Sequence, residues 1–242
     1  MDSPGMATLV PLLKSPLFGL SLTFGVYYLA QRLYWRTKAF IFNPVLVSIV
    51  AIICILKLIG IEYKTYFAGA KLISFFLGPA VVALGVLLYE QLEEIARRGP
   101  AIIVGAVAGA AAGIVSAAGL GMWLGAEPQV INSLAPKSVT TPIAMGIAAR
   151  LGGIESLTAA VVIATGVLGA VLGPGFLRLI RVKDPTAFGL AMGAASHGIG
   201  TARALEEGPL QGATGGLAIC LCGLATALMA PLIMKLLWWL GG

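Results

Sequence analysis

Charged residues are scarce in this chain of 242 residues. Only 11% of the residues are charged, whereas 59% are hydrophobic, and the mean hydropathy is +0.97. A soluble domain carries about 25% charged residues, so this composition excludes an ordinary soluble protein and indicates an integral membrane protein. Apolar stretches recur along nearly the whole length, which leaves no room for a soluble domain. We therefore expect a single integral membrane domain over residues 1–242.

Metal-ligating and nucleophilic patterns are also missing. His197 is the only histidine, and Cys54, Cys220 and Cys222 lie in apolar runs without a second CxC or CxxC pattern. We expect no metal site, no disulfide framework and no cofactor. The sequence has no GxSxG, no HExxH and no pair of intramembrane aspartates, so an enzyme is not the expected class.

The positive charge of the chain does not indicate nucleic-acid binding. The net charge is +6, but the basic residues are spread between apolar spans rather than gathered on one face. Two groups stand out, and the excess of basic residues in cytoplasmic loops places both on the cytoplasmic side. They are Arg32, Arg36 and Lys38, and Arg178, Arg181 and Lys183.

Five apolar runs predict ordinary membrane-spanning helices. They cover about 16–31, 43–60, 100–124, 154–177 and 210–240. Asn43-Pro44 indicates a capped helix start, because Asn binds free amides and Pro is tolerated at the first helical position. Gly105, Gly109 and Gly113 recur every four residues, which predicts a face for close helix packing rather than chemistry.

Three further segments, 66–92, 127–152 and 184–208, resemble helices broken in the middle. The interruptions fall at Gly78-Pro79, at Pro136 to Pro142 and at Ser196 to Gly200, so each helical piece is too short to span a bilayer. Within a membrane, non-helical backbone persists only beside a cavity or a packed neighbour. The two polar interruptions, APKSVTTP and ASHGIGTAR, therefore predict one shared binding site.

A weak internal repeat appears at a shift of about 120 residues. Gly69 and Gly78 then fall on Gly189 and Gly198. The pattern predicts repeats over 9–124 and 127–240, and duplicated halves with discontinuous helices are typical of secondary transporters. Whether the repeats are parallel or inverted is open. The expected fold is an all-α polytopic membrane protein of the elevator-transporter type.

The first polar interruption is suited to an anion. Lys137, Ser138, Thr140 and Thr141 precede a helical start at Pro142, and helix amides attract negative charge. In the alternative, Lys137 caps the preceding half-helix and the hydroxyls satisfy broken backbone.

Three ionisable residues have two interpretations each. We place Arg203 in the first turn of a half-helix, where a cation needs a negative partner, either a substrate carboxylate or the nearby Glu206 and Glu207. His197 is a candidate for proton coupling, or a structural hydrogen-bonding residue. Glu90 is a second coupling candidate, or part of a solvated loop edge.

Three strings carry a family resemblance over nearly the whole chain: PAVVALGVLLYEQL at 79–92, LAPKSVTTPIAM at 134–145 and GLAMGAASHGIGTARALEE at 189–207. They resemble the LrgB/CidB membrane proteins, which include antiholin-like bacterial proteins and half of the plastid glycolate/glycerate translocator. The chain departs from the pattern at Leu87, where many relatives have proline. The family's signature positions fall on Lys137, Ser138, Thr140, Thr141, Pro142, Ser196, His197, Gly198, Gly200, Thr201 and Arg203.

The resemblance implies a prokaryotic inner-membrane carrier of small hydroxy- or oxo-monocarboxylates, related in fold to bile-acid symporters. It also implies a homodimer and a small LrgA/CidA-like membrane partner. We predict a carboxylate held between the amides of the two interruptions, with Arg203 or Lys137 neutralising its charge. The alternative is a holin-like or antiholin-like regulator of murein hydrolases that carries no substrate.

Overall fold

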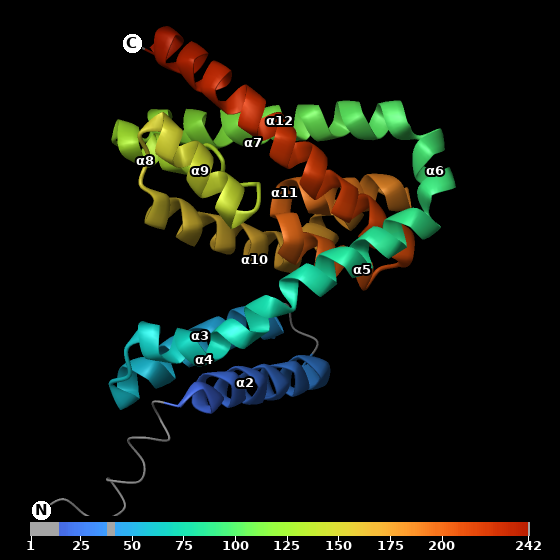
Figure 1. Cartoon of the computed structure of the whole chain (residues 1–242). Helices are drawn as coiled ribbons and strands as arrows, with labels where there is room; N and C mark the ends of the chain where they lie inside the picture. Colours follow the sequence, from blue (N-terminus) through green and yellow to red (C-terminus); the bar gives the residue numbers. More distant parts are fainter. Residues whose placement is uncertain (1–14, 38–41, 242) are drawn as a thin grey trace, which may run out of the picture. The chain divides into compact units, whose positions relative to one another are not determined.

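The computed structural model describes residues 15–37 and 42–241, and these are helical throughout apart from short connections (Figure 1). Lys38, from the first basic group, lies outside the described residues. The helices are α2 (Pro16–Thr37), α3 (Pro44–Ile59), α4 (Tyr63–Phe75), α5 (Leu77–Glu90), α6 (Leu92–Arg97), α7 (Gly99–Trp123), α8 (Pro128–Leu134), α9 (Thr141–Leu151), α10 (Glu155–Leu179), α11 (Pro185–Leu205) and α12 (Pro209–Gly241).

The chain forms two compact units that divide after Val82. In the first unit, α2 packs against α3 and α4. The predicted start of the second span is confirmed, because the Asn43 side chain accepts from the amides of Val45 and Leu46. Gly60, in the left-handed conformation, ends the same helix and donates to the Leu56 carbonyl.

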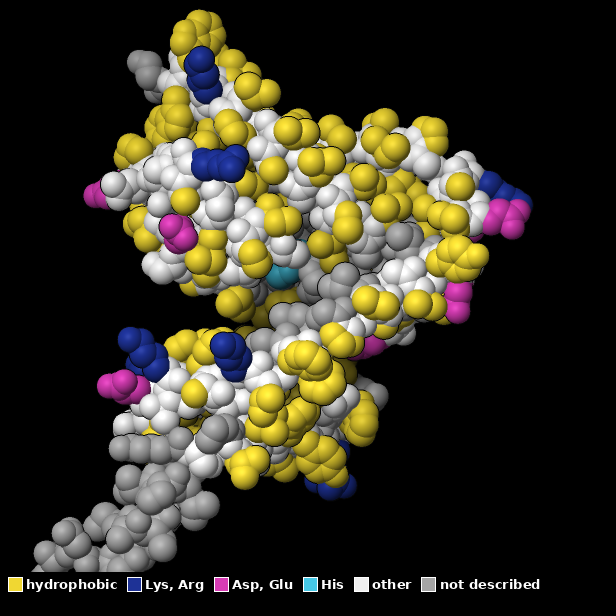
Figure 2. All heavy atoms as spheres, viewed as in Figure 1, with side chains coloured by type: hydrophobic (Ala, Val, Ile, Leu, Met, Phe, Trp, Pro, Cys, Tyr) yellow, Lys and Arg dark blue, Asp and Glu magenta, His cyan; other side chains and the backbone are white. Residues whose placement is uncertain are grey.

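The second unit contains the helices that identify a membrane protein. Within the described residues, three helices are long and apolar enough to cross a membrane: Gly99–Trp123, Glu155–Leu179 and Pro209–Leu240. They correspond to three of the five predicted spans. The other two predicted spans form α2 and α3, but α3 is shorter and α2 is not apolar enough to qualify. Figure 2 shows hydrophobic side chains over most of the visible face of this unit.

The helical path is interrupted close to the three predicted positions. Phe76 separates α4 from α5, so Gly78 and Pro79 lie in the first turn of α5, where proline removes no intrahelical bond. Residues 135–140 separate α8 from α9. Ser196 and His197 have non-helical backbone angles inside α11.

Helix α11 packs against α7, α10 and α12 and buries about half of its residues. Close approach to α12 depends on glycine: a Cβ atom at Gly189 or Gly193 would overlap the backbone of α12. Ion pairs hold the ends of this helix. Arg98 pairs with Asp184, the residue before α11, and Glu207, after α11, binds Arg178 at 2.5 Å.

Candidate functional site

A cavity of about 500 Å³ lies between α7, the interruption before α9, and the first half of α11. Most of its lining residues are small, among them the glycine stripe Gly105, Gly109 and Gly113 of α7 and Ala194 and Ala195 of α11. The polar side chains in the lining are Lys137, Ser138 and Ser116. The stripe therefore contributes to a cavity as well as to helix packing, which the spacing alone did not predict.

The interruption at 135–140 is fixed by apolar anchors on either side of Lys137. Ala135 and Val139 are buried in a core cluster with residues of α7, α8, α9, α10 and α12. Pro136 is buried as well, so Lys137 and Ser138 are the residues of this segment that line the cavity. The two polar residues are thus held between buried apolar neighbours, and Lys137 reaches the cavity from a segment that is not a regular helix.

Lys137 has no acidic partner in the part of the chain that the structure describes. Among the described residues, its ammonium nitrogen makes one hydrogen bond, which it donates to Ser138 Oγ at 3.3 Å. Lys137 also follows the end of α8 by three residues, so its interpretation as a favourable cation at that helix end remains a prediction. A partly buried cation without a counter-charge favours binding of an anion.

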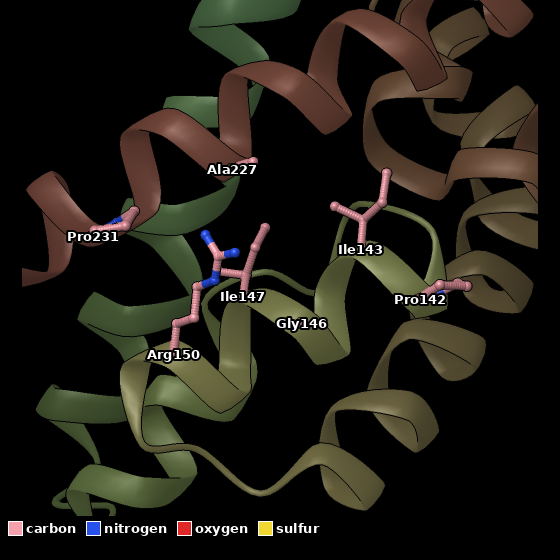
Figure 3. A pocket seen from close by; sticks show the side chains of 7 residues that line it. All are labelled: Pro142, Ile143, Gly146, Ile147, Arg150, Ala227 and Pro231. Carbon is pink, nitrogen blue, oxygen red and sulfur yellow. The ribbon is translucent and has the colours of Figure 1, made fainter.

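The start of α9 leaves backbone amides without a side-chain acceptor. Thr140 occupies the N-cap position with extended backbone angles, but its hydroxyl makes no capping hydrogen bond. Thr141 begins the helix, and the first-turn amides of a helix have no intrahelical acceptor. Pro142 has no amide and lines a different pocket, the groove toward α12 shown in Figure 3. Thr140, Thr141 and Pro142 are therefore beside the cavity rather than in its lining.

The second interruption turns its side chains away from this cavity. Ser196 is 1% exposed, and a Cβ atom at Gly169 of α10 would overlap its hydroxyl. His197 Nε2 lies 3.0 Å from the Val162 carbonyl of α10 and therefore carries the proton that it donates. These two residues pack against α10, although Ala194 and Ala195 just before them line the cavity.

The backbone at this interruption is strained. His197 has φ 42° and ψ −133°, a conformation that costs a residue with a Cβ atom about 1 to 3 kcal/mol. Gly200 lies so close to the Met192 carbonyl across the interruption that a Cβ atom would overlap it. Gly198 has open space around its Cα. The turn therefore requires glycine at 200 rather than at 198.

Thr201 carries a buried hydroxyl without a partner. The residue is 1% exposed, and its Oγ1 makes no hydrogen bond within the described part of the chain. It faces α12 at Gly215, where a Cβ atom would lie 3.1 Å from Oγ1. Of the predicted site residues, only Lys137 and Ser138 are brought together in the cavity lining. A substrate role remains a prediction for all of these residues, Lys137 and Ser138 included.

The predicted placement of Arg203 was wrong. Arg203 lies in the last turn of α11, because the helix resumes directly after His197, and a cation is favoured at that end. Its guanidinium binds Glu207 at 2.7 Å and Glu206 at 3.4 Å. The local acidic residues therefore supply its counter-charge.

Glu90 ends α5 and is exposed. The neighbouring carboxylates of Glu93 and Glu94 bind Arg97 and Arg98 at 2.6 and 3.0 Å. Glu90 makes no ion pair among the described residues and does not line the cavity, so its coupling role also remains a prediction. The same part of the chain holds no cluster of three or more metal-ligating side chains.

Asp184 has the best-defined electrostatic environment outside the spans. Its carboxylate accepts from the Ala187 amide at 2.9 Å and binds Arg98, and these bonds lower the pKa of the carboxyl below its ordinary value of 3.8. Asp184 thus caps α11, whereas α9 begins without a side-chain cap.

Comparison with known proteins gives a consistent result. A description of the LrgB-like family matches residues 23–236. A Bacillus subtilis protein, YxaC, is 36% identical over 215 residues, which cover 89% of this chain and 94% of the relative. The antiholin-like protein LrgB of Bacillus mycoides is 34% identical over 221 residues, 91% of this chain and 96% of the relative. A Haemophilus influenzae protein is 35% identical over 217 residues, 90% of this chain and 94% of the relative. No solved structure matches the chain.

Proposed function

The chain belongs to the LrgB-like family, and we propose that it is a multi-pass protein of a bacterial inner membrane that carries small monocarboxylates. The substrates we propose are hydroxy- and oxo-acids of the size of glycolate, glycerate and pyruvate. Carriage would use discontinuous helices in an elevator-type movement of two repeats, in a homodimer with a small LrgA/CidA-like partner.

One observation supports this proposal most strongly. Lys137 projects into a cavity of about 500 Å³ and has no carboxylate partner among the described residues. The glycine and alanine walls offer few polar groups that could solvate the ammonium. A carboxylate at this position would neutralise the cation and accept from Ser138 Oγ as well, and charge-assisted hydrogen bonds are the strong ones.

The start of α9 supplies the second part of the proposed site. Its uncapped first turn begins three residues after Ser138, and its amides, together with the hydroxyls of Thr140 and Thr141, would orient the second carboxylate oxygen. Thr201 and Ser196 would be reached only if α11 shifts against α10 and α12. Arg203 is not part of this proposal, because Glu206 and Glu207 already bind it.

Proton coupling is proposed for His197, with Glu90 as a second candidate. His197 is buried and bound to one carbonyl of α10, so its second ring nitrogen can take up a proton when the contact with α10 opens. Coupling would then link protonation to movement of α11 rather than to direct contact with substrate.

Uptake into proteoliposomes tests the proposed carrier. Radiolabelled glycolate and pyruvate are offered at an inside pH of 7.5 and an outside pH of 6.0 or 7.5, with purified protein alone. We expect saturable uptake that rises at the lower outside pH. Lys137→Gln should reduce uptake at least tenfold, since a charge-assisted contact contributes about 1.5 to 3 kcal/mol. Lys183→Gln, at an exposed position, is the matched control.

The name of several relatives supports a second candidate function. Proteins 33 to 34% identical to this chain are named antiholin-like protein LrgB, so regulation of lysis without substrate carriage is the alternative. The alternative gains if the folded protein moves neither acid, with and without its small partner, while its deletion alters murein hydrolase activity. If Lys137→Gln instead retained full uptake, the protein would be a carrier but the cavity at Lys137 would not be its substrate site.

A further inference from the structure

We propose that the groove between α9 and α12 binds one anionic phospholipid, with its headgroup at Arg150 and part of an acyl chain along the groove. The groove has a volume of about 230 Å³ and is lined by residues of α9 from Pro142 to Arg150 and by Ala227 and Pro231 of α12 (Figure 3). It is separate from the Lys137 cavity, because the two pockets share no lining residue.

Arg150 gives the groove its charge preference. The residue is exposed in the last turn of α9, and its guanidinium points toward α12 (Figure 3). No carboxylate binds Arg150 within the described part of the chain. Four other arginines of the second unit do pair with acidic residues: Arg97, Arg98, Arg178 and Arg203. A phosphodiester fits a planar guanidinium with two parallel hydrogen bonds.

Helix α12 adds a second cation and a free acceptor. Lys235 follows Pro231 by four residues, so it lies on the same helix face one turn further on. Pro231 has no amide hydrogen and therefore leaves the Ala227 carbonyl without its usual helical donor. A headgroup that has both a phosphate and hydroxyl groups, such as that of phosphatidylglycerol, would satisfy these cations and this carbonyl together.

A chain of hydrogen bonds places Arg150 near the membrane surface. Asn132 donates to the carbonyl of Leu151, the residue after Arg150, at 2.6 Å, and it accepts from Trp238 Nε1 at 3.4 Å. Tryptophan is enriched at the headgroup level of membranes, where its ring is apolar and its N–H is hydrated. Arg150 therefore lies at the depth of lipid phosphates. The groove extends from there along α9 for about 12 Å into the hydrocarbon region, at about 1.5 Å per residue.

Quenching of tryptophan fluorescence by brominated lipids tests the headgroup preference. The protein carries Trp35→Phe and Trp123→Phe, so that Trp238 and Trp239 report, and it is placed in nanodiscs of brominated phosphatidylglycerol or brominated phosphatidylcholine. We expect stronger quenching by phosphatidylglycerol. Arg150→Gln should lower that preference about fivefold, since a cation near an anionic lipid surface contributes about 1 kcal/mol. Arg181→Gln, exposed in the loop after α10, should leave it unchanged.

A second pair of variants tests the acyl chain. Gly146 lines the groove, and no atom lies within 4 Å of the position that a Cβ atom would take there, so Gly146→Leu fills the groove without a backbone clash. It should reduce quenching by both lipids, whereas Gly119→Leu, at an equally open position on α7, should not. Equal quenching by the two lipids, or full quenching in Gly146→Leu, overturns the proposal. A change of oligomeric state in Gly146→Leu without a change in quenching also overturns it, because the groove would then be a subunit interface.

Discussion

The two polar interruptions of the second unit are built in opposite ways. The first, at 135–140, buries Ala135 and Val139 and presents Lys137 to a cavity. The second, at Ser196 and His197, buries its polar side chains against α10 and leaves the cavity to the alanines that precede it. One interruption therefore displays its polar chemistry, and the other uses its polar groups for packing.

The sequence predicted one shared role for both interruptions, but their structures differ enough to suit two different roles. A carrier needs a charge that is available to substrate and a joint that holds its helices in one arrangement at a time. Under the proposed carrier function, the first interruption would supply the charge and the second would supply the joint. The variants below test that division, in order of their expected effect on stability.

Gly169→Ala should have the largest effect. The new Cβ atom would overlap Ser196 Oγ, so we expect a destabilisation of about 3 kcal/mol, measured as a fall in the melting temperature in detergent. Gly175→Ala, on the same helix with nothing within 4 Å, should be neutral or slightly stabilising. Ser196→Gly in the Gly169→Ala background should restore much of the loss. A Gly169→Ala protein as stable as Gly175→Ala would show that the second interruption is not packed against α10.

His197→Ala should destabilise the protein by about 1 to 2 kcal/mol, because the hydrogen bond to the Val162 carbonyl is lost. His197→Gly loses the same bond but relieves the backbone at φ 42°, so it should be about 1 kcal/mol more stable than His197→Ala. Thermal unfolding of both variants side by side measures the difference. The reverse order would contradict the strained conformation.

The helix starts give a smaller contrast. Asp184→Ala should cost about 1 kcal/mol at pH 7 through loss of the cap, whereas Thr140→Ala should cost almost nothing, since Thr140 makes no capping bond. The bond to Ala187 and the pairing with Arg98 lower the pKa of Asp184, so its stabilisation is present above about pH 4 and is lost as the pH falls through the lowered value. The difference between Asp184→Ala and the parent protein should therefore shrink near pH 3 in melting curves.

Lys137→Gln should have the smallest effect on stability, within about 0.5 kcal/mol, because the lysine has no ion pair to lose among the described residues. The same substitution should have the largest effect on uptake. A variant that melts much earlier than the parent would give Lys137 a structural role and blur the distinction between the two interruptions.

The positions of most helices were predictable because their signals are local. Asn43-Pro44 marks a helix start through capping chemistry, and the long apolar runs correspond to α7, α10 and α12. The bounds of the interruptions lie within three residues of the predicted ones, since proline and glycine act on their own backbone. The repeats over 9–124 and 127–240 remain a prediction.

The candidate site was less predictable, because it depends on contacts between distant segments. The direction of Ser196 and His197 is decided by Gly166 and Gly169 on α10, about 30 residues earlier in the chain. Arg203 was misplaced because the interruption was expected to extend to Gly200, whereas the helix resumes at Gly198. The four-residue spacing of the glycines on α7 predicted a face for close helix packing. It did not predict that the same face and Lys137 line one cavity.

The glycine faces on either side of α11 have unequal consequences for movement. The Ser196 side chain occupies the space beside Gly169 of α10, where a larger residue would place its Cβ atom. Any sliding of α11 along α10 must therefore first withdraw this side chain. On α7, Gly109 meets Ala194 at ordinary spacing, and a Cβ atom at Gly105 would lie 2.7 Å from the end of the flexible Leu190 side chain of α11. The proposed shift of α11 against α10 and α12 must therefore first withdraw Ser196 from Gly169, whereas the contact of Leu190 with α7 can adjust by side-chain rotation.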